Sequence, residues 1–149
     1  YLNDIIMNCI ELKIKIVKQD ERDSGIRKIL NFGHTIGHAL ESFLGYDYIR
    51  HGEAVAYGML YASKLSNAHS NLTEENLVRI NNLIRQLKLP ELKNIKIDQI
   101  INFIKNDKKN TAMGLSFILL NNIGSADISQ TINYHDIKTV LKDYEYISY

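Results

Sequence analysis

The sequence predicts a mainly α-helical domain that carries one small β-hairpin near its C-terminus. Apolar residues recur at helical spacing along the chain as far as Lys105. The pattern changes to short apolar runs only at LSFILLNNIGSADIS, where Asn122 and Gly124 mark a turn between two strands. A length of 149 residues suffices for one sizeable core, and no repeat or linker divides it, so we expect residues 1–149 to form a single domain.

A charged break separates the first two helices. Residues 3–18 carry a wide apolar stripe that includes Cys9, which predicts a well-buried first helix. The segment KQDERDSG follows it. A second helix is expected over residues 26–44, because Gly45 is a suitable C-terminal cap and the residues after it lack periodicity.

The third helix, expected over residues 51–67, has an unusual surface. Small residues recur on it at four-residue intervals and form a smooth stripe on which another backbone can lie closely, namely Ala54, Gly58 and Ala62. Caps and periodicity predict the remaining elements: a helix that opens at Thr73 and ends before Pro90, a helix over 98–105, strands over 115–120 and 126–129, and a last helix over 134–144.

Charge and composition exclude several classes of function. The formal net charge is +1 and the charged residues are scattered, which leaves no basic surface for nucleic acid or for an anionic membrane. No signal peptide or membrane-spanning run is visible. The one cysteine, Cys9, can form no internal disulfide and favours a reducing compartment, so we expect a cytoplasmic protein.

The second helix departs from ordinary helix composition. Gly33 and Gly37 fall in its interior, where each costs about 1 kcal/mol relative to alanine. Opposite the apolar stripe, polar residues recur at spacings of four and three and so lie on one line: Arg27, Asn31, His34, His38 and Glu41. A solvated helix face is usually rich in Lys, Glu and Gln, whereas these side chains suit metal coordination, proton transfer and anion binding.

Two histidines one turn apart can hold a divalent metal, and Zn²⁺ is the usual ion for imidazole with carboxylate. Within the chain, Glu41, His51 and Glu53 are candidates to complete the ligand set, and spacing alone chooses none of them. His51 can reach the pair if the small-residue stripe of the third helix packs on Gly33 and Gly37. The alternative for His51 is a surface or helix-capping histidine.

Three segments, taken together and in this order, carry a family resemblance: DERDSGIRKILNFGHTIGHALE, HGEAVAYGM and DKKN. With them the chain resembles the C-terminal domain of the 3-dehydroquinate synthase family over nearly its whole length. The resemblance implies the C-terminal half of a two-domain α/β plus α enzyme. An N-terminal NAD-binding domain, absent from this chain, would precede it, with the active site in the cleft between the two.

The implied reaction converts 3-deoxy-D-arabino-heptulosonate 7-phosphate to 3-dehydroquinate and phosphate, in the shikimate pathway toward aromatic amino acids. Such a phosphate-eliminating lyase requires NAD, bound mainly by the absent domain, and Zn²⁺ or another divalent metal such as Co²⁺. Two alternatives stay open. One is another sugar-phosphate cyclase, of the inosose or valiolone synthase type, and the other is a non-catalytic helical module.

The resemblance also assigns roles to residues of the central motifs. His34 and His51 match the zinc ligands, and His38 matches a histidine that transfers protons beside the substrate. Glu41 is expected either to orient an imidazole or to lie plainly on the helix surface. Asp23 of DERD stands where the family more often has Glu, and the shorter side chain puts its part in proton transfer in question.

Cationic and amide side chains match the positions that bind the anionic substrate: Lys13, Arg27, Asn31 and Lys108. The third zinc ligand, a glutamate, belongs to the absent half. The chain begins without an initiator methionine, and we expect it to be inactive alone as part of a longer enzyme. The resemblance further implies a homodimer.

Overall fold

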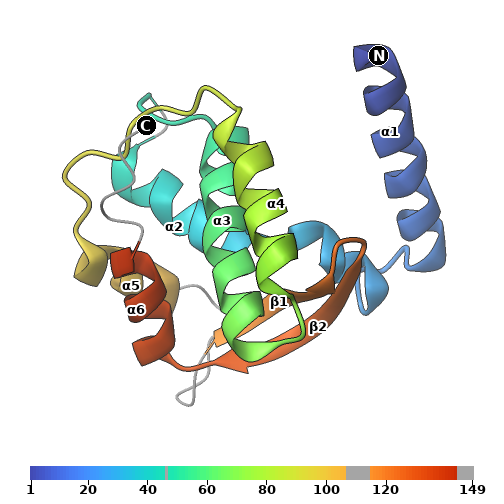
Figure 1. Cartoon of the computed structure of the whole chain (residues 1–149). Helices are drawn as coiled ribbons and strands as arrows, with labels where there is room; N and C mark the ends of the chain where they lie inside the picture. Colours follow the sequence, from blue (N-terminus) through green and yellow to red (C-terminus); the bar gives the residue numbers. More distant parts are fainter. Residues whose placement is uncertain (46, 107–114, 144–149) are drawn as a thin grey trace.

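The computed structural model describes residues 1–45, 47–106 and 115–143. The elements, in chain order, are α1 (Leu2–Gln19), the 3₁₀ helix η1 (Ile26–Asn31), α2 (His34–Leu44), α3 (His51–His69), α4 (Glu74–Arg85), α5 (Ile97–Asn106), β1 (Leu115–Asn122), β2 (Ser125–Ile132) and α6 (Tyr134–Asp143). The predicted fold class, a mainly helical chain with a hairpin near the C-terminus, is confirmed (Figure 1).

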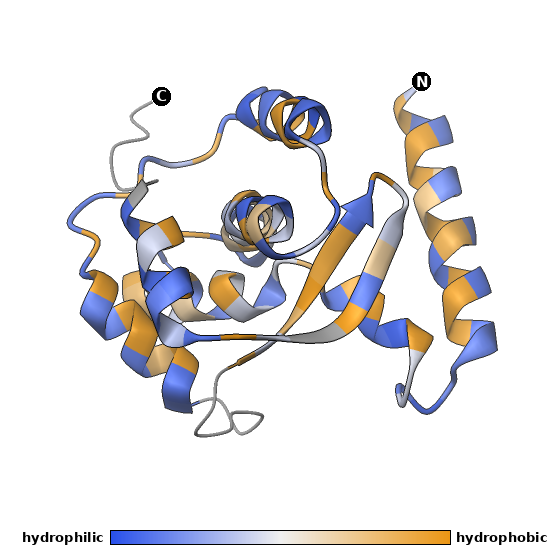
Figure 2. Ribbon diagram, turned by 60° about the horizontal axis from the view of Figure 1, so that its bottom comes forward, coloured by the Kyte–Doolittle hydropathy of each residue, from blue (hydrophilic) through white to orange (hydrophobic). Residues whose placement is uncertain are grey.

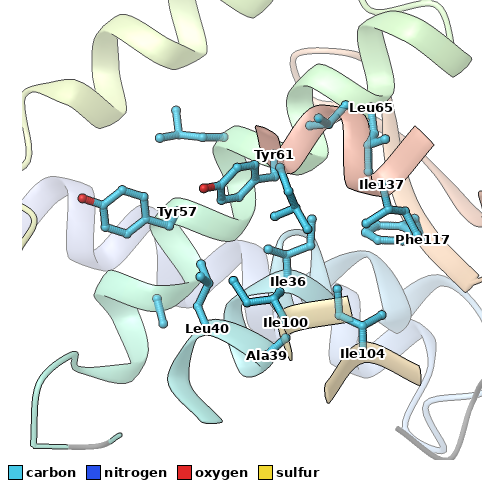
Figure 3. Close-up of a cluster of buried hydrophobic side chains, with 14 of the residues drawn as sticks. Ile36, Ala39, Leu40, Tyr57, Tyr61, Leu65, Ile100, Ile104, Phe117 and Ile137 are labelled. Atoms are coloured by element: carbon cyan, nitrogen blue, oxygen red, sulfur yellow. The ribbon is translucent and has the colours of Figure 1, made fainter. Parts of the chain in front are cut away.

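Helix α3 lies at the centre of the fold and contacts α2, α4, α6 and β1 (Figure 1). Its predicted stripe of small residues is buried, with Ala54 and Ala62 at most 1% exposed. Figure 3 shows Tyr61 and Leu65 of α3 among apolar side chains from α2, α5, β1 and α6. Burial of this apolar surface is the main force that holds the helices together.

The hairpin is stabilised by its contact with α3. Strands β1 and β2 pair antiparallel, with Leu115 opposite Ile132, and the pairing is irregular between Phe117 and Leu119. The hydroxyl of Ser66, on α3, donates to the Ala62 carbonyl and accepts from the backbone N–H of Leu120 on β1. A two-stranded hairpin needs such support, because an isolated one is marginally stable in water.

The prediction of one continuous helix over residues 26–44 is wrong. The segment forms η1 and α2, which are separated at Phe32 and Gly33. Gly33 has φ +81° and precedes α2 instead of lying inside it, so only Gly37 of the two glycines is in a helix interior. The physical reason is a close approach of Met59 and Gly58 to Gly33, which the left-handed conformation of a glycine permits.

The prediction of a well-buried first helix is also wrong. Ile16 is the one buried residue of α1 in the structure, and large apolar residues such as Ile6 and Ile10 are 47% and 46% exposed. Cys9 is exposed as well. Helix α1 stands to one side of the molecule and carries apolar bands along its length (Figures 1 and 2). Within the described residues, no helix combines the length and the apolar character that crossing a membrane requires.

Candidate metal centre

Three glycines set the close contact between α2 and α3. A Cβ on Gly58 would collide with the carbonyl oxygen of Gly33 and would lie 2.8 Å from the backbone nitrogen of Gly37. A Cβ on Gly37 would lie 3.0 Å from the Cα of Val55. The third helix thus packs on Gly33 and Gly37, which is the condition under which His51 was expected to reach the histidine pair. The backbones therefore approach more closely than helices with side chains at these positions could.

The close approach brings three histidines together, which we call the histidine cluster: His34 and His38 from α2 and His51 from α3. The ring centroid of His34 lies 5.4 Å from that of His38 and 5.5 Å from that of His51. The ring centroids of His38 and His51 are also 5.5 Å apart. One nitrogen of each ring lies within 4.8 Å of the others. Neither Glu41 nor Glu53, the other candidate ligands, belongs to this group.

His34 is the first residue of α2 and is partly buried. Its Nδ1 lies 3.4 Å from the carbonyl oxygen of Phe32, at the break between η1 and α2. Burial lowers the pKa of His34 below its usual value of 6.5, and the neighbouring His38 and His51 lower it further. A neutral imidazole is the form that binds a metal, so this environment suits a ligand.

His51 is the first residue of α3, and its side chain is 55% exposed. Its Nδ1 lies 3.3 Å from Oε2 of Glu41, whose residue is only 7% exposed. Glu41 is therefore not the plain surface carboxylate that the sequence left possible. The carboxylate of Glu53 accepts from the backbone N–H of Arg50 at 2.8 Å and so stabilises the start of α3.

His38 is exposed and lies beside a hollow of about 330 Å³ between α2 and α5. Polar side chains from both helices line it, together with one aromatic ring: Thr35, Ser42, Asn106 and Phe103. The positions of Thr35 and Ser42, three residues before and four after His38, could have indicated the α2 side of this hollow. Nothing in the sequence indicated the α5 side, because that contact is long-range.

Of the predicted substrate-binding residues that the structure describes, Lys13 lies on α1, and Arg27 and Asn31 lie on η1. Lys13 is exposed on α1, to one side of the molecule. The Arg27 guanidinium donates to the Glu21 carbonyl at 3.1 Å, and Asn31 is exposed at the end of η1. Because η1 and α2 are separate helices, the predicted line from Arg27 to the histidines along one helix face is not formed. Lys108 lies outside the described residues.

Asp23 is exposed in the turn between α1 and η1, with φ +53°. The residue that organises this turn is Asp20, which the sequence reasoning missed. Its carboxylate accepts from the backbone N–H groups of Ser24, Gly25 and Arg27. These bonds, with that of Gly25 as the largest contribution, hold the pKa of Asp20 below 3.8. An aspartate shortly before Ser-Gly is a recognisable turn signal.

The donor set fits a divalent metal such as Zn²⁺ or Co²⁺. Imidazole nitrogens bind Zn²⁺ at about 2.0 to 2.1 Å, so ligand atoms within 4.8 Å of one another need to move by only about 1 Å. Nδ1 of His34 and of His51 already has an oxygen partner, which leaves Nε2 of each ring for an ion. His34 and His51 would therefore present Nε2 to such an ion.

Comparison with known sequences finds one family over most of the chain. The family model described as 3-dehydroquinate synthase C-terminal matches residues 1–110. The 3-dehydroquinate synthase of Rippkaea orientalis is 43% identical over 142 residues, which cover 94% of this chain and 39% of the relative. That of Geobacter metallireducens is 41% identical, over 94% of this chain and 38% of the relative. The chain thus spans well under half the length of these relatives.

Solved structures of related cyclases share the fold. A 2-deoxy-scyllo-inosose synthase, in complex with carbaglucose-6-phosphate, NAD⁺ and Co²⁺, matches 95% of this chain and 41% of its own at a TM-score of 0.81 and 28% identity. The 2-epi-5-epi-valiolone synthase of Streptomyces hygroscopicus, with NAD⁺ and Zn²⁺ bound, matches 94% of this chain and 39% of its own at a TM-score of 0.79 and 22% identity. The matched sequence model and the curated relatives together show that this chain belongs to the 3-dehydroquinate synthase C-terminal family.

Proposed function

We propose that this chain is the metal- and substrate-binding half of an enzyme that converts 3-deoxy-D-arabino-heptulosonate 7-phosphate to 3-dehydroquinate and phosphate. The observation that carries the proposal is the histidine cluster, in which two imidazoles from α2 meet one from α3. Relatives named 3-dehydroquinate synthase, about 40% identical over nearly the whole chain, support the choice of reaction.

In this proposal His34 and His51 hold the metal, which would polarise substrate hydroxyl groups when bound. His38 transfers protons, since its exposed ring faces the hollow between α2 and α5. Both His34 and His51 begin a helix, and the partial positive charge of two helix N-termini favours an anionic substrate there.

The remaining substrate contacts are assigned to Lys13, Arg27, Asn31 and Lys108, whose cationic and amide groups suit a carboxylate and a phosphate. Asp23 is assigned to the proton-transfer path. These residues would complete the site together with the preceding half of the enzyme, which would hold most of the NAD and supply a further metal ligand. We also propose that the enzyme forms a homodimer and is located in the cytoplasm.

Metal binding tests the first part. We expect the chain to bind Co²⁺ and Zn²⁺ in calorimetric titrations, and His34→Ala and His51→Ala to weaken binding at least about tenfold. His135→Ala is the matched control, because His135 is an exposed histidine on α6 outside the cluster. Equal binding by all three variants would refute the metal assignment.

Turnover tests the second part in a longer protein, in which this chain follows the N-terminal portion of the Rippkaea orientalis relative. We expect that protein to release phosphate from 3-deoxy-D-arabino-heptulosonate 7-phosphate, and its His38→Ala variant to be slower by about 10² to 10⁴. The likeness to the inosose synthase favours a hexose phosphate as the competing substrate. Turnover of that compound alone would reassign the reaction, and turnover of neither would favour a non-catalytic module.

A further inference from the structure

We propose that Glu41 is a positioning residue: its buried carboxylate holds the His51 ring so that Nε2, and not Nδ1, is presented to the histidine cluster. This inference rests on the proposed metal site and adds a residue to it. Glu41 touches neither the ion nor the substrate in this proposal, and acts through His51.

The burial of Glu41 requires a partner for its charge. Glu41 is 7% exposed, and its Oε2 accepts a hydrogen bond from Nδ1 of His51 at 3.3 Å. A buried carboxylate is stable only when it is hydrogen-bonded or paired. The bond spans two helices, because Glu41 lies on α2 and His51 on α3. It is therefore a tertiary contact, in which a residue of α2 bonds a proposed metal ligand of α3.

The bond determines the tautomer of His51. A carboxylate only accepts hydrogen bonds, so Nδ1 of His51 must carry the proton, and the lone pair of the neutral ring is then on Nε2. The His51 side chain is 55% exposed, and few packing contacts restrict the rotation of so open a ring. The tether to Glu41 supplies the restriction that packing does not.

The two predicted ligands are held by partners of different charge. Nδ1 of His34 faces the neutral carbonyl oxygen of Phe32, whereas Nδ1 of His51 faces a carboxylate. A carboxylate partner makes an imidazole a more basic ligand, and loss of such a partner typically costs about 10-fold to 100-fold in metal affinity. We therefore expect His51 to depend on its partner more than His34 does.

The position of Glu41 in α2 explains how this helix can both provide two histidines and orient His51. Glu41 follows His34 by seven residues, or about two helical turns, so the two side chains lie on the same face. The contact of Gly58 with Gly33 and Gly37 then places the start of α3 against that face. Helix α2 thus provides two histidines of the cluster and also orients the third.

The first test uses the metal-free chain, so it does not depend on the ion. Nitrogen chemical shifts of His51 should report a proton on Nδ1 in the unaltered chain. Glu41→Ala should shift His51 toward the Nε2-protonated tautomer, while Glu41→Gln, whose amide oxygen still accepts a hydrogen bond, should keep the original one. Glu53→Gln is the matched control, because it makes the same substitution near His51 in a side chain that bonds the Arg50 backbone and not the His51 ring.

The second test adds Co²⁺ and Zn²⁺ alone. Glu41→Ala should weaken binding about 10-fold to 100-fold and alter the visible absorption of bound Co²⁺. Glu41→Gln should lose less, and Glu53→Gln should match the unaltered chain. Circular dichroism checks that each variant is folded, and Glu41→Gln decides the matter if Glu41→Ala does not fold.

An unchanged tautomer in folded Glu41→Ala would overturn the proposal, as would equal losses of affinity in Glu41→Gln and Glu53→Gln. Failure of the proposed function has a different signature. The unaltered chain would then show no binding that depends on His34 and His51, while the tautomer of His51 would still respond to Glu41.

Discussion

Gly58 of α3 lies directly against the carbonyl group of Gly33, the residue that precedes α2, so there is no room for a side chain between them. The contact explains two features of the site at once. It lies at Gly33, whose left-handed conformation separates η1 from α2, and the close packing of α3 on α2 brings the rings of their first residues within 5.5 Å of each other. His34 and His51 are those first residues. The geometry of the histidine cluster therefore depends on glycines outside it.

Gly58→Ala is expected to lower the free energy of unfolding by about 3 kcal/mol or more, because the new methyl group collides with backbone that cannot move aside cheaply. Gly52→Ala, in the same helix, is the matched control. No atom lies within 4 Å of a Cβ there, so the change should be neutral or stabilising by up to about 1 kcal/mol. Urea unfolding measures both values, and a small loss at Gly58 would contradict the described contact.

Gly33→Ala and Gly124→Ala separate backbone strain from steric collision. The two glycines have φ of +81° and +85°, so alanine should be strained at both by about 1 to 2 kcal/mol. A Cβ on Gly33 would also lie 2.7 Å from the backbone nitrogen of Met59, whereas the space around Gly124 is open. We expect Gly33→Ala to cost about 1 to 3 kcal/mol more than Gly124→Ala. If both variants lose the same free energy of unfolding in urea, backbone strain alone explains the loss and the collision with Met59 is contradicted.

The metal-free chain is expected to lose stability as the pH falls below about 6.5. Burial lowers the pKa of His34 in the folded state, so the unfolded chain binds a proton at this residue at higher pH than the folded chain does. The contribution of His34 to the free energy of unfolding is complete above the pKa of 6.5 in the unfolded chain. It is lost as the pH falls through the lowered pKa of the folded chain.

The His34→Asn variant should show a smaller decline in urea unfolding between about pH 8 and about pH 5, with a chelator present. His135→Asn, which replaces an exposed histidine, should keep the decline of the unaltered chain. If His34→Asn and the unaltered chain decline in parallel, His34 is not the group responsible.

Helix α1 should tolerate substitution on most of its surface. Ile6 is 47% exposed, so Ile6→Ala should change the free energy of unfolding by no more than about 0.5 kcal/mol. Ile16 is 8% exposed, and Ile16→Ala should cost about 2 kcal/mol or more. Chemical denaturation measures both values. A large loss of stability in Ile6→Ala would show that α1 is well buried, as the periodicity predicted.

Local sequence was sufficient to predict the hairpin and the helices other than the pair η1 and α2. Thr73 accepts a hydrogen bond from the backbone N–H of Asn76 at the predicted start of α4, and the turn at Gly124 joins the two predicted strands. The packing of the two glycine-containing segments was also predictable, because a stripe of small residues has few uses other than close backbone contact. Such signals depend on a residue and its near neighbours, so they can be read without a fold.

Other features depend on contacts between residues that are distant in the chain. Periodicity alone continued one helix through Gly33, since nothing local indicates that Met59 will lie against it. Apolar residues in α1 indicated burial, but burial requires a neighbouring surface, and the described residues provide one only near Ile16. Spacing put Glu41 in line with His34, whereas its bond to His51 follows from the packing of α3 against α2. The sequence determined which chemical groups are available, and long-range packing determined which of them meet.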